Sequence, residues 1–525
     1  MKDLIIIGAG TAGCVLAERL TRSGNRQVLL IEAGGEPNDK FVKIPAGFAR
    51  LFKSQLDWAF ESEPQPRAAG RQIYVPRGRM LGGSSNINAQ IHQWCHPADF
   101  AEWVADGATG WGWEDVVPVF QAQERWLGED PAGRRGKEGP MIVSPNRNAH
   151  RLSQAFVESA RASSLGSQPS YNGQHYQGAW IPELANLKSQ RYSAYDAYLK
   201  PSLSRANLEV MKNTHVLRIE VEDGRAVGVT VREGDSERTI DARGIVLAAG
   251  AFGSPQLLML SGIGAADKLA QFGIGVKCDL PGVGEALQDH PMTALICRTR
   301  GTDTLRTIES LPNLLRYILF RRGPLGSNAV EAMAFAHHSG DRTAPPDIEL
   351  IMAPFEWRNQ GLDLPEVDAF GIGAAVVAPR SRGRVTLRSP HPLDAPSIDF
   401  NLLSDAEGAD AKALIAAFRL ARRIVATQPL AGFVETEQFP GAALTADDEL
   451  QQALASMLQT VYHPTSTCRM GNDQGAVVDP RLRVRGIDGL WVADASVMPR
   501  VPRGHPNAVV AMIANRGAAW IDAAL

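Results

Sequence analysis

A glycine pattern near the N-terminus constrains the fold more than any other feature of the sequence. The uninterrupted apolar run Leu4–Ile7 leads directly into Gly8-Ala9-Gly10-Thr11-Ala12-Gly13, and apolar residues at helical spacing follow over residues 14–22. A second apolar run ends at Glu32. Strand, glycine turn, helix and strand in this order predict a βαβ unit of a parallel sheet that binds a dinucleotide.

Each conserved element of that pattern has a physical role. Gly8 permits the tight turn, Gly10 lets the backbone approach a pyrophosphate, and Gly13 lets the helix pack closely on the strand. Glu32 can accept hydrogen bonds from the ribose hydroxyls, which argues against the 2′-phosphate of NADP but does not separate NAD from FAD. The alternative, a glycine-rich turn in an unrelated α/β protein, leaves Glu32 unexplained.

Length and composition exclude several classes of protein. A chain of 525 residues is too long for one typical core, so at least two structural units are expected. With 54 basic and 57 acidic residues, the sequence suggests no nucleic-acid partner. The five cysteines are scattered and odd in number, which favours a reducing, cytoplasmic setting over a disulfide framework. No apolar run approaches the ~20 residues that span a bilayer, so no membrane insertion is expected.

Several motifs spread along the chain carry a family resemblance. These are "GRMLGGSSNINAQIH" (residues 78–92), "RYSAYDAYL" (191–199), "GAFGSPQLLMLSGIG" (250–264), "GVGEALQDHP" (282–291), "HPTSTCRMG" (463–471) and "GLWVADASVMP" (489–499). Together they resemble the glucose–methanol–choline (GMC) flavoprotein oxidoreductases, and the resemblance runs nearly end to end. It implies that the dinucleotide is FAD and that the protein is an enzyme oxidising CH–OH groups of a small-molecule alcohol. It also implies oxygen or another electron acceptor as the second partner.

The resemblance assigns cofactor contacts outside the glycine turn. Gly83, Ser84 and Asn88 match residues that meet the pyrophosphate and flavin, and Val216 matches a backbone contact to adenine. Simpler roles are a loop that caps a helix and a plain strand valine. Some relatives carry a flavin-linking histidine where this chain has Ile87, so we expect non-covalent FAD. The complete set of predicted cofactor-binding residues is Gly8, Gly10, Thr11, Ala12, Gly13, Glu32, Ala33, Gly83, Ser84, Asn88, Val216, Asp494, Ala495 and Pro506.

Asp494 and Ala495 follow the apolar run 490–492 and match the family's contact to the ribityl-pyrophosphate. The alternative is an aspartate at a strand end that caps the next turn.

Two histidines match the catalytic pair of the family. Oxidation of an alcohol requires removal of the hydroxyl proton, and histidine, with an ordinary pKa of ~6.5, suits that task. We assign His463 as the general base and His505 as the residue that positions the substrate oxygen and stabilises developing negative charge. The roles could be exchanged. Both histidines could instead be structural, with His505 holding a turn at a helix N-terminus.

Cys468, five residues after His463, raises the question of a metal site. A zinc site would need further ligands, and the neighbouring sequence offers no Cys-x-x-Cys or second histidine at ligand spacing. We therefore predict no metal. Cys468 is expected to be a small buried apolar residue.

The predicted fold class is α/β with an α+β second domain. A Rossmann-like FAD-binding domain comprises residues 1–150, 205–290 and 455–525. Residues 151–204 and 291–454 form a discontinuous substrate domain on a mostly antiparallel sheet with helices on one side. Residues 213–231 predict a β-hairpin with "EDGR" as its turn. Residues 41–77 read as an irregular loop, which by resemblance covers the flavin.

Substrate clues come from the tail of the first motif. His92 and Trp94 depart from the family pattern and would form an aromatic, hydrogen-bonding wall if they reach the pocket. They favour an aromatic or heteroaromatic primary alcohol, with pyridoxine a candidate; alternatively, both are packing residues. Other functions on this fold are a choline-type or aliphatic alcohol dehydrogenase, a redox-silent hydroxynitrile lyase, and a non-enzymatic flavin-binding protein. Retention of both histidines favours an enzyme.

Overall fold

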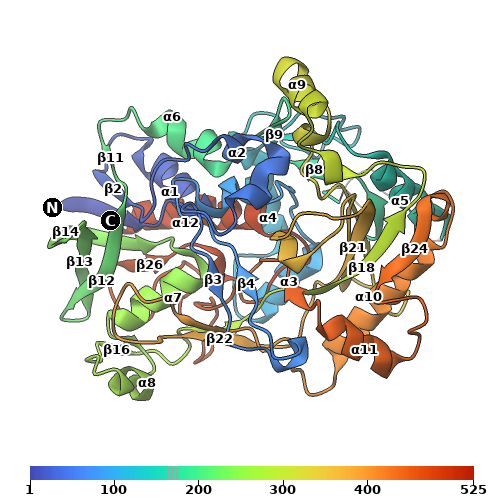
Figure 1. Ribbon diagram of the computed structural model, residues 1–525. Coiled ribbons are helices and arrows are strands. Elements are labelled where there is room, and N and C mark those ends of the chain that lie inside the picture. Colours follow the sequence, from blue (N-terminus) through green and yellow to red (C-terminus); the bar gives the residue numbers. More distant parts are fainter. Residues whose placement is uncertain (164, 167–170, 173–175) are drawn as a thin grey trace.

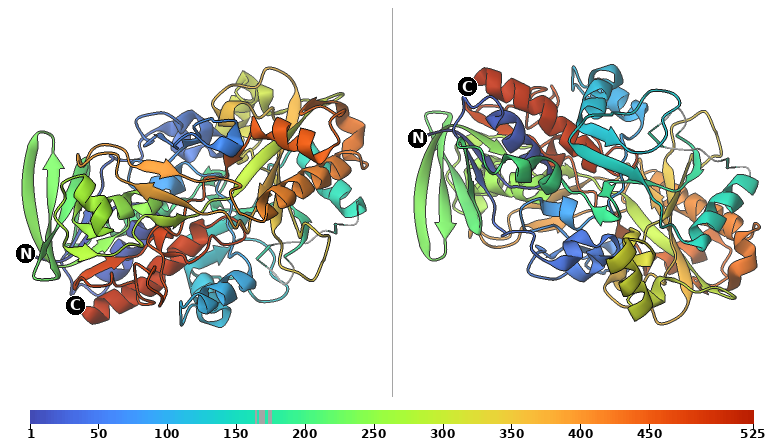
Figure 2. Two further views of the ribbon diagram at one scale, coloured as in Figure 1. Left: turned by 90° about the horizontal axis from the view of Figure 1, so that it is seen from below. Right: turned by 90° about the horizontal axis from the view of Figure 1, so that it is seen from above.

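The computed structural model describes residues 1–163, 165–166, 171–172 and 176–525. Two seven-stranded sheets dominate it. The first lies at the end of the molecule that carries both termini, and the second lies at the opposite end (Figures 1 and 2).

The first sheet contains the predicted nucleotide-binding unit. Its parallel core has the order β11-β2-β1-β14, with β26 paired to β14. The helices α1 (Thr11–Thr21) and α12 (Asn507–Ala524) pack against each other beside it. The predicted order of strand, glycine turn, helix and strand is confirmed. The strands are β1 (Lys2–Ile7), β2 (Val28–Ile31), β11 (Leu208–Met211), β14 (Ser236–Leu247) and β26 (Leu490–Val492).

An antiparallel extension completes this sheet. β12 (Thr214–Glu222) pairs with β13 (Arg225–Glu233), and β13 pairs with β14. Asp223 and Gly224 form the turn with positive φ angles of 45° and 75°, a conformation that glycine adopts readily. The predicted hairpin is confirmed.

The second sheet is antiparallel throughout, as predicted. Its order is β24-β18-β21-β20-β19-β7, with β25 paired to β18. The helices α10 (Ala409–Val425) and α5 (Arg151–Ala162) pack against the sheet and against each other. The strands are β7 (Gly178–Trp180), β18 (Pro291–Thr299), β19 (Ala332–Ala336), β20 (Ile348–Ala353), β21 (Ala369–Val376), β24 (Val434–Phe439) and β25 (Gln459–Thr460).

Alternation along β20 gives this sheet two different faces. Leu350 and Met352 belong to the apolar core that includes α10, whereas Ile351 and Ala353 line a cavity on the other face. Glu349 shares the parity of Ile351 and so points to the cavity side, because successive strand residues face opposite ways. The sheet therefore separates a helix-covered core from the region that contains the site.

The strand β25 crosses the predicted domain division. Residues 455–525 were assigned to the FAD-binding domain, yet Thr460 pairs with Pro291 of the second sheet. The remaining boundaries of the division stay a prediction.

Residues 41–77 are more regular than the predicted loop. Proline begins two short helical turns, at Pro45 and Pro66, where the missing N–H costs nothing. The buried carboxylate of Asp57 accepts backbone hydrogen bonds from Lys53 and Arg77 at 2.9 and 2.8 Å. The segment contains α2 (Lys40–Lys43), η1 (Pro45–Leu51), β3 (Phe60–Glu61), η2 (Pro66–Ala68) and β4 (Tyr74–Val75).

The remaining elements cover or connect the two sheets. They are η3 (Gly83–Asn86), α3 (Pro97–Ala105), α4 (Trp113–Gln123), β5 (Glu124–Trp126), β6 (Met141–Pro145), β8 (Glu183–Leu184), β9 (Asn186–Leu187), β10 (Gln190–Arg191), η4 (Tyr195–Leu199), α6 (Lys200–Ser202), α7 (Gly250–Leu260), β15 (Ile263–Gly264), α8 (Ala266–Gln271), β16 (Cys278–Asp279), β17 (Glu285–Leu287), η5 (Leu305–Thr307), α9 (Leu311–Phe320), η6 (Pro324–Gly326), η7 (Asn359–Gly361), β22 (Gly383–Thr386), β23 (Ser397–Asp399), η8 (Leu430–Phe433), α11 (Asp447–Ala455) and η9 (Ala495–Val497).

Candidate active site

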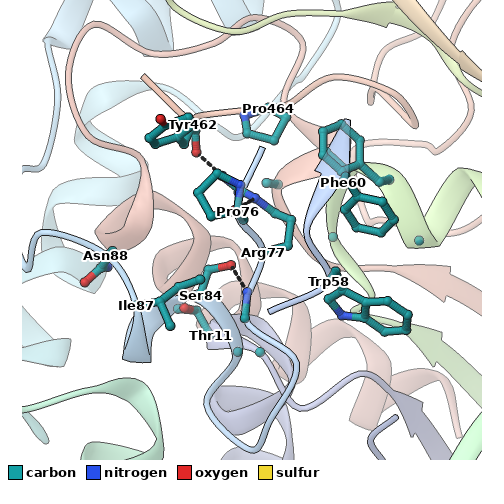
Figure 3. Close-up of a pocket in the computed structure, with 18 of the residues that line it drawn as sticks. Thr11, Trp58, Phe60, Pro76, Arg77, Ser84, Ile87, Asn88, Tyr462 and Pro464 are labelled. Atoms are coloured by element: carbon teal, nitrogen blue, oxygen red, sulfur yellow. Dashed lines mark hydrogen bonds between the residues drawn. The ribbon is translucent and has the colours of Figure 1, made fainter. Parts of the chain in front are cut away.

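One cavity of about 740 Å³ joins the glycine turn of the first sheet to the inner face of the second. Both predicted catalytic histidines line it. So do all of the predicted cofactor-binding residues except Gly13. A close-up shows Thr11, Ser84, Ile87 and Asn88 on one side of the site and Tyr462 and Pro464 on another (Figure 3).

The three glycines of the turn differ in what surrounds them. A Cβ at Gly13 would lie 1.8 Å from the carbonyl oxygen of Gly8, so only glycine lets α1 pack there. A Cβ at Gly10 would meet no atom within 4 Å and would project into open space. Gly83 packs closely on Gly10: a Cβ added at Gly83 would lie 2.7 Å from Cα of Gly10. The backbone at Gly10 is therefore bare toward the cavity, as a pyrophosphate at the N-terminus of α1 requires.

Glu32 is held rigidly at the end of β2. Its carboxylate accepts hydrogen bonds from the backbone N–H groups of Ala9 and Gly34, each at 2.8 Å. Burial raises the pKa of Glu32, and those two hydrogen bonds oppose the shift. The carboxylate borders the cavity and has acceptor capacity left for a ribose hydroxyl.

Ser84 and Asn88 are fixed by neighbours that the motif alone does not reveal. Oγ of Ser84 accepts a hydrogen bond from the backbone N–H of Gly78 at 3.1 Å (dashed in Figure 3). Oδ1 of Asn88 accepts from the buried guanidinium of Arg191 at 2.7 Å. Arg191 lies in the "RYSAYDAYL" stretch, so this second family motif supports the first.

Asp494 lines the cavity, and its carboxylate also caps the turn that follows β26, which was the alternative role expected for it. Oδ1 accepts hydrogen bonds from the backbone and hydroxyl of Ser496, at 2.8 and 2.6 Å. Oδ2 accepts from the hydroxyl of Ser254 and the backbone of Gly250, at 2.6 and 2.8 Å. Asp494 therefore fixes the start of α7 and of η9 at the cavity edge.

The two catalytic candidates come from separate loops and meet at the cavity. The ring centroids of His463 and His505 lie 4.7 Å apart with an interplanar angle of 77°. His463 follows β25, and His505 precedes α12, whose N-cap is Pro506. His505 is also held by its backbone N–H, which donates to Oε1 of Gln93 at 2.9 Å.

Three further residues extend this pair and were missed in the sequence. Nδ1 of His290 lies 3.0 Å from Nδ1 of His463, and Oε1 of Glu349 lies 3.0 Å from Nε2 of His505. Oδ1 of Asp289 accepts from the backbone N–H of His463 at 2.9 Å. His290 and Asp289 belong to the family stretch "GVGEALQDHP", which was a detectable signal. Glu349 had only one signal, an acid within the apolar run 346–355.

Burial sets the protonation of the histidine row. The pKa of His463 lies well below its ordinary value, first because of burial and then because of the positive charge of His505. Burial, followed by the same charge, lowers the pKa of His290 to about 3. Burial raises the pKa of Asp289 to about 7, against hydrogen bonds that favour its ionised form. His463 is therefore neutral at physiological pH, the state in which an imidazole can accept a proton.

The second sheet supplies a largely apolar wall to the cavity. The described residues of β18, β20 and β21 that line the cavity are Met292, Ala294, Ile351, Ala353, Gly371 and Gly373, and Val330 and Trp357 border them; none of these is a carboxylate. Aromatic residues add to it from other segments: Phe48, Phe52, Trp58, Phe60 and Tyr462. Arg77 donates to the carbonyl oxygen of Tyr462, which Figure 3 shows as a dashed line.

His92 and Trp94 do not form the predicted substrate wall. Both are buried away from the cavity, where Nε2 of His92 and Nε1 of Trp94 lie 3.1 and 3.2 Å from Oε2 of Glu124. Trp94 also stacks on Phe120 at a centroid distance of 5.6 Å. The packing alternative holds because the wholly buried Glu124 accepts hydrogen bonds from Trp94 and Arg135, and His92 packs within 3.1 Å of the same carboxylate.

Cys468 is a buried free thiol, and the other four cysteines are also free. Burial raises its pKa, so the thiol stays protonated and is a poor metal ligand. His337, His338 and Asp347 place ligand atoms within 4.8 Å of one another, but neither catalytic candidate belongs to that group.

The chain is similar to known proteins along nearly its whole length. Two family models, both described as GMC oxidoreductase, match residues 2–292 and 379–514. An alcohol dehydrogenase (acceptor) of Pseudomonas putida is 36% identical over 99% of this chain and 95% of its own length. An oxygen-dependent choline dehydrogenase of Rhizobium etli is 37% identical over 98% and 94%. The solved structure of pyridoxine 4-oxidase from Mesorbium loti superposes with a TM-score of 0.91 at 32% identity, covering 99% of both chains.

Proposed function

Because the chain belongs to the GMC oxidoreductase family, an enzyme family that acts on CH–OH groups with FAD, we propose that it oxidises an aromatic or heteroaromatic primary alcohol to the aldehyde. The observation that carries the proposal is the approach of His463 and His505 at one end of a cavity whose other end is the glycine turn.

FAD fits the residues that are present. Gly8, Gly10 and Glu32 would hold its pyrophosphate and ribose, while Ser84 and Asn88 border the flavin side. When bound, FAD supplies the acceptor for the hydride that leaves the alcohol carbon. Ile87 lines the cavity and has no nucleophilic atom, which supports non-covalent attachment. Acid denaturation should then release all flavin from the protein into the supernatant.

His463 is proposed as the base that takes the hydroxyl proton. Its Nδ1 is occupied by His290, so Nε2 is the nitrogen left for the substrate. This requires the tautomer in which Nδ1 of His463 carries a proton and donates a hydrogen bond to Nδ1 of His290. Neutral His463 is favoured by its burial.

His505 is proposed to bind the substrate oxygen. Glu349 occupies Nε2 of His505, which leaves Nδ1 for the alcohol. The carboxylate of Glu349 is fully buried, so it interacts strongly with a proton on that ring. Positive charge on His505 would stabilise the alkoxide character that develops as His463 removes the proton.

The cavity wall supports an uncharged, ring-bearing alcohol. Apolar and aromatic side chains favour a ring by burial and by edge or face contacts. A quaternary ammonium would favour a free carboxylate in the wall. The described cavity-lining residues of the second sheet include none, and Glu349, the carboxylate on this face, lies behind the lining and is paired with His505. The likeness to pyridoxine 4-oxidase supports a heteroaromatic substrate, while the choline dehydrogenase relative makes choline the comparison substrate.

Anaerobic mixing tests the proposal. The holoenzyme is mixed with benzyl alcohol, pyridoxine, choline and hexan-1-ol while the visible absorbance of oxidised flavin is followed. We expect the ring-bearing alcohols to bleach the flavin and to yield one aldehyde for each flavin reduced. Bleaching by choline or hexan-1-ol alone would refute the substrate class. Failure of all four, with cleavage of mandelonitrile, would favour the lyase.

The electron acceptor and the cellular location are separate questions from the substrate. Oxygen and a non-oxygen acceptor are both proposed as candidates for reoxidation, and stopped-flow mixing of reduced enzyme with oxygen separates them. No helix in the described part of the chain is both long and apolar enough to pass through a bilayer. A cytoplasmic location remains a prediction from the scattered cysteines.

A further inference from the structure

The helix α9 exposes an unusual amount of apolar surface. It stands away from the body of the molecule in Figure 1. Among the described residues, fourteen large hydrophobic side chains are exposed, and six of them lie in these ten residues. Ile318 is 55% exposed and Leu319 and Phe320 are each 67% exposed. Single exposed apolar residues are ordinary, but a contiguous group marks a contact surface.

The apolar side chains form a stripe that points outward. Leu311, Leu314, Leu315 and Ile318 have the i, i+3, i+4, i+7 spacing of one helix face. Tyr317, the only buried residue of α9, faces the body and donates its hydroxyl to the carbonyl oxygen of Ser189 at 3.0 Å. A helix that covers a core turns its apolar stripe inward, so α9 is reversed relative to that pattern.

Positive charge accompanies the stripe. The segment from Leu311 to Gly323 has no acidic residue and contains Arg316, Arg321 and Arg322. None of these three forms an ion pair within the described part of the chain. The nearest preceding acid, Glu309, is paired with Arg50 at 2.6 Å and so leaves the arginines uncompensated.

We propose that α9 docks on an anionic lipid surface, lying in the headgroup region with its apolar stripe toward the acyl chains. Apolar residues beside unpaired arginines are the two features that an interfacial helix combines. Ten residues extend about 15 Å, half of the ~30 Å hydrocarbon core, so α9 can lie in the surface but not span it.

A second copy of the chain could instead cover α9, but the positive charge of the helix disfavours such a dimer. In a two-fold contact the same patch lies on both partners. Two α9 helices would then bring six arginines together with no acid on either helix to balance them. An anionic membrane supplies that balance.

Vesicle sedimentation tests the docking. Full-length holoenzyme is spun with phosphatidylcholine vesicles and with vesicles that also contain phosphatidylglycerol. We expect sedimentation with the anionic vesicles, weaker binding to neutral ones, and loss at high salt. The triple variant Leu315→Ser/Ile318→Ser/Leu319→Ser should bind at least about tenfold more weakly. Arg316→Gln/Arg322→Gln should lose the preference for anionic lipid, at about fivefold per arginine.

Matched controls separate docking from folding. Leu203→Ser/Val276→Ser removes exposed apolar residues elsewhere and should sediment like the parent protein. All variants should keep the flavin spectrum and the unfolding temperature, because the altered side chains are exposed. Absence of parent sedimentation, equal binding of the α9 triple variant, or a parent dimer that this variant abolishes would each overturn the proposal. These readouts do not depend on the alcohol substrate.

Discussion

Nδ1 of His290 lies 3.0 Å from Nδ1 of His463, so the two imidazoles must adopt complementary tautomers. One ring must carry its proton on Nδ1 and donate, and the other must have a bare Nδ1 and accept. If both Nδ1 atoms carried protons, two donors would face each other. His290 is wholly buried and its pKa is lowered to about 3, so it remains neutral. It can therefore accept from His463 and leave Nε2 of His463 unprotonated.

Replacement of the proposed base should separate chemistry from cofactor binding. We expect His463→Ala to retain FAD but to reduce it at least ~10²-fold more slowly under anaerobic conditions, the scale of general-base catalysis. Stopped-flow flavin absorbance measures the rate, and the flavin-to-protein ratio measures binding. Reduction at the parent rate would remove His463 from the mechanism.

His290 should act through the orientation of His463. In His290→Asn the side-chain oxygen can still accept a hydrogen bond near the former Nδ1, whereas His290→Leu has no acceptor. We expect the leucine variant to reduce flavin about tenfold or more slowly and the asparagine variant to recover part of that loss. The two variants are compared at saturating substrate, so that the measured rate reports kcat and does not depend on KM. Equal rates in both variants would contradict the orienting role.

The pH dependence of flavin reduction should show an acid limb. A base works in its neutral form, so the rate falls as pH drops through the pKa of His463. Burial and the charge of His505 place that pKa below the ordinary ~6.5, so the limb should lie below that pH. Asp289, with a pKa of about 7, is the neighbouring group that could imitate it. Asp289→Asn should keep the limb; its disappearance there would assign the titration to Asp289.

Two glycine substitutions should have opposite consequences. Gly10→Ala adds a methyl group to open space at a φ of −69°, so the apoprotein should keep its unfolding temperature but bind FAD at least about tenfold more weakly. Gly13→Ala forces a Cβ to within 1.8 Å of the Gly8 carbonyl oxygen and should destabilise the fold by several kcal/mol, about the cost of overpacking. Calorimetry of both apoproteins and FAD titration check the pair. Equal unfolding temperatures would contradict it.

Local patterns sufficed for the nucleotide-binding unit. The apolar run before Gly8, the glycine spacing and Glu32 depend on short-range rules, and the hairpin turn at Gly224 does as well. The antiparallel pairing of β19, β20 and β21 was also predictable, because these strands follow one another in the sequence, whereas β18 and β7 join them across long separations. These features involve residues whose partners are near in sequence or whose spacing has one structural meaning.

Long-range packing explains what could not be predicted. His92 and Trp94 both lie against Glu124, a buried acid whose neighbours cannot be inferred from its own segment. Glu349 reaches His505 across 156 positions, and only the pairing register of β20 reveals which face it occupies. The apolar run in α9 likewise looks like a core helix until its surroundings are known. In each case the sequence gives the identity of the side chain but not the residues that pack against it.

The hydroxyl of Thr11, at the start of α1, donates to Oδ1 of Asn507, at the start of α12, across 496 positions of the chain. His505 and Pro506 immediately precede that contact, so these two distant segments must both be present before the cavity closes. A ribosome delivers the glycine turn long before the proposed catalytic histidines. The cavity is therefore expected to be completed late in biogenesis, and a chain that terminates before His463 would present the glycine turn without the proposed catalytic pair.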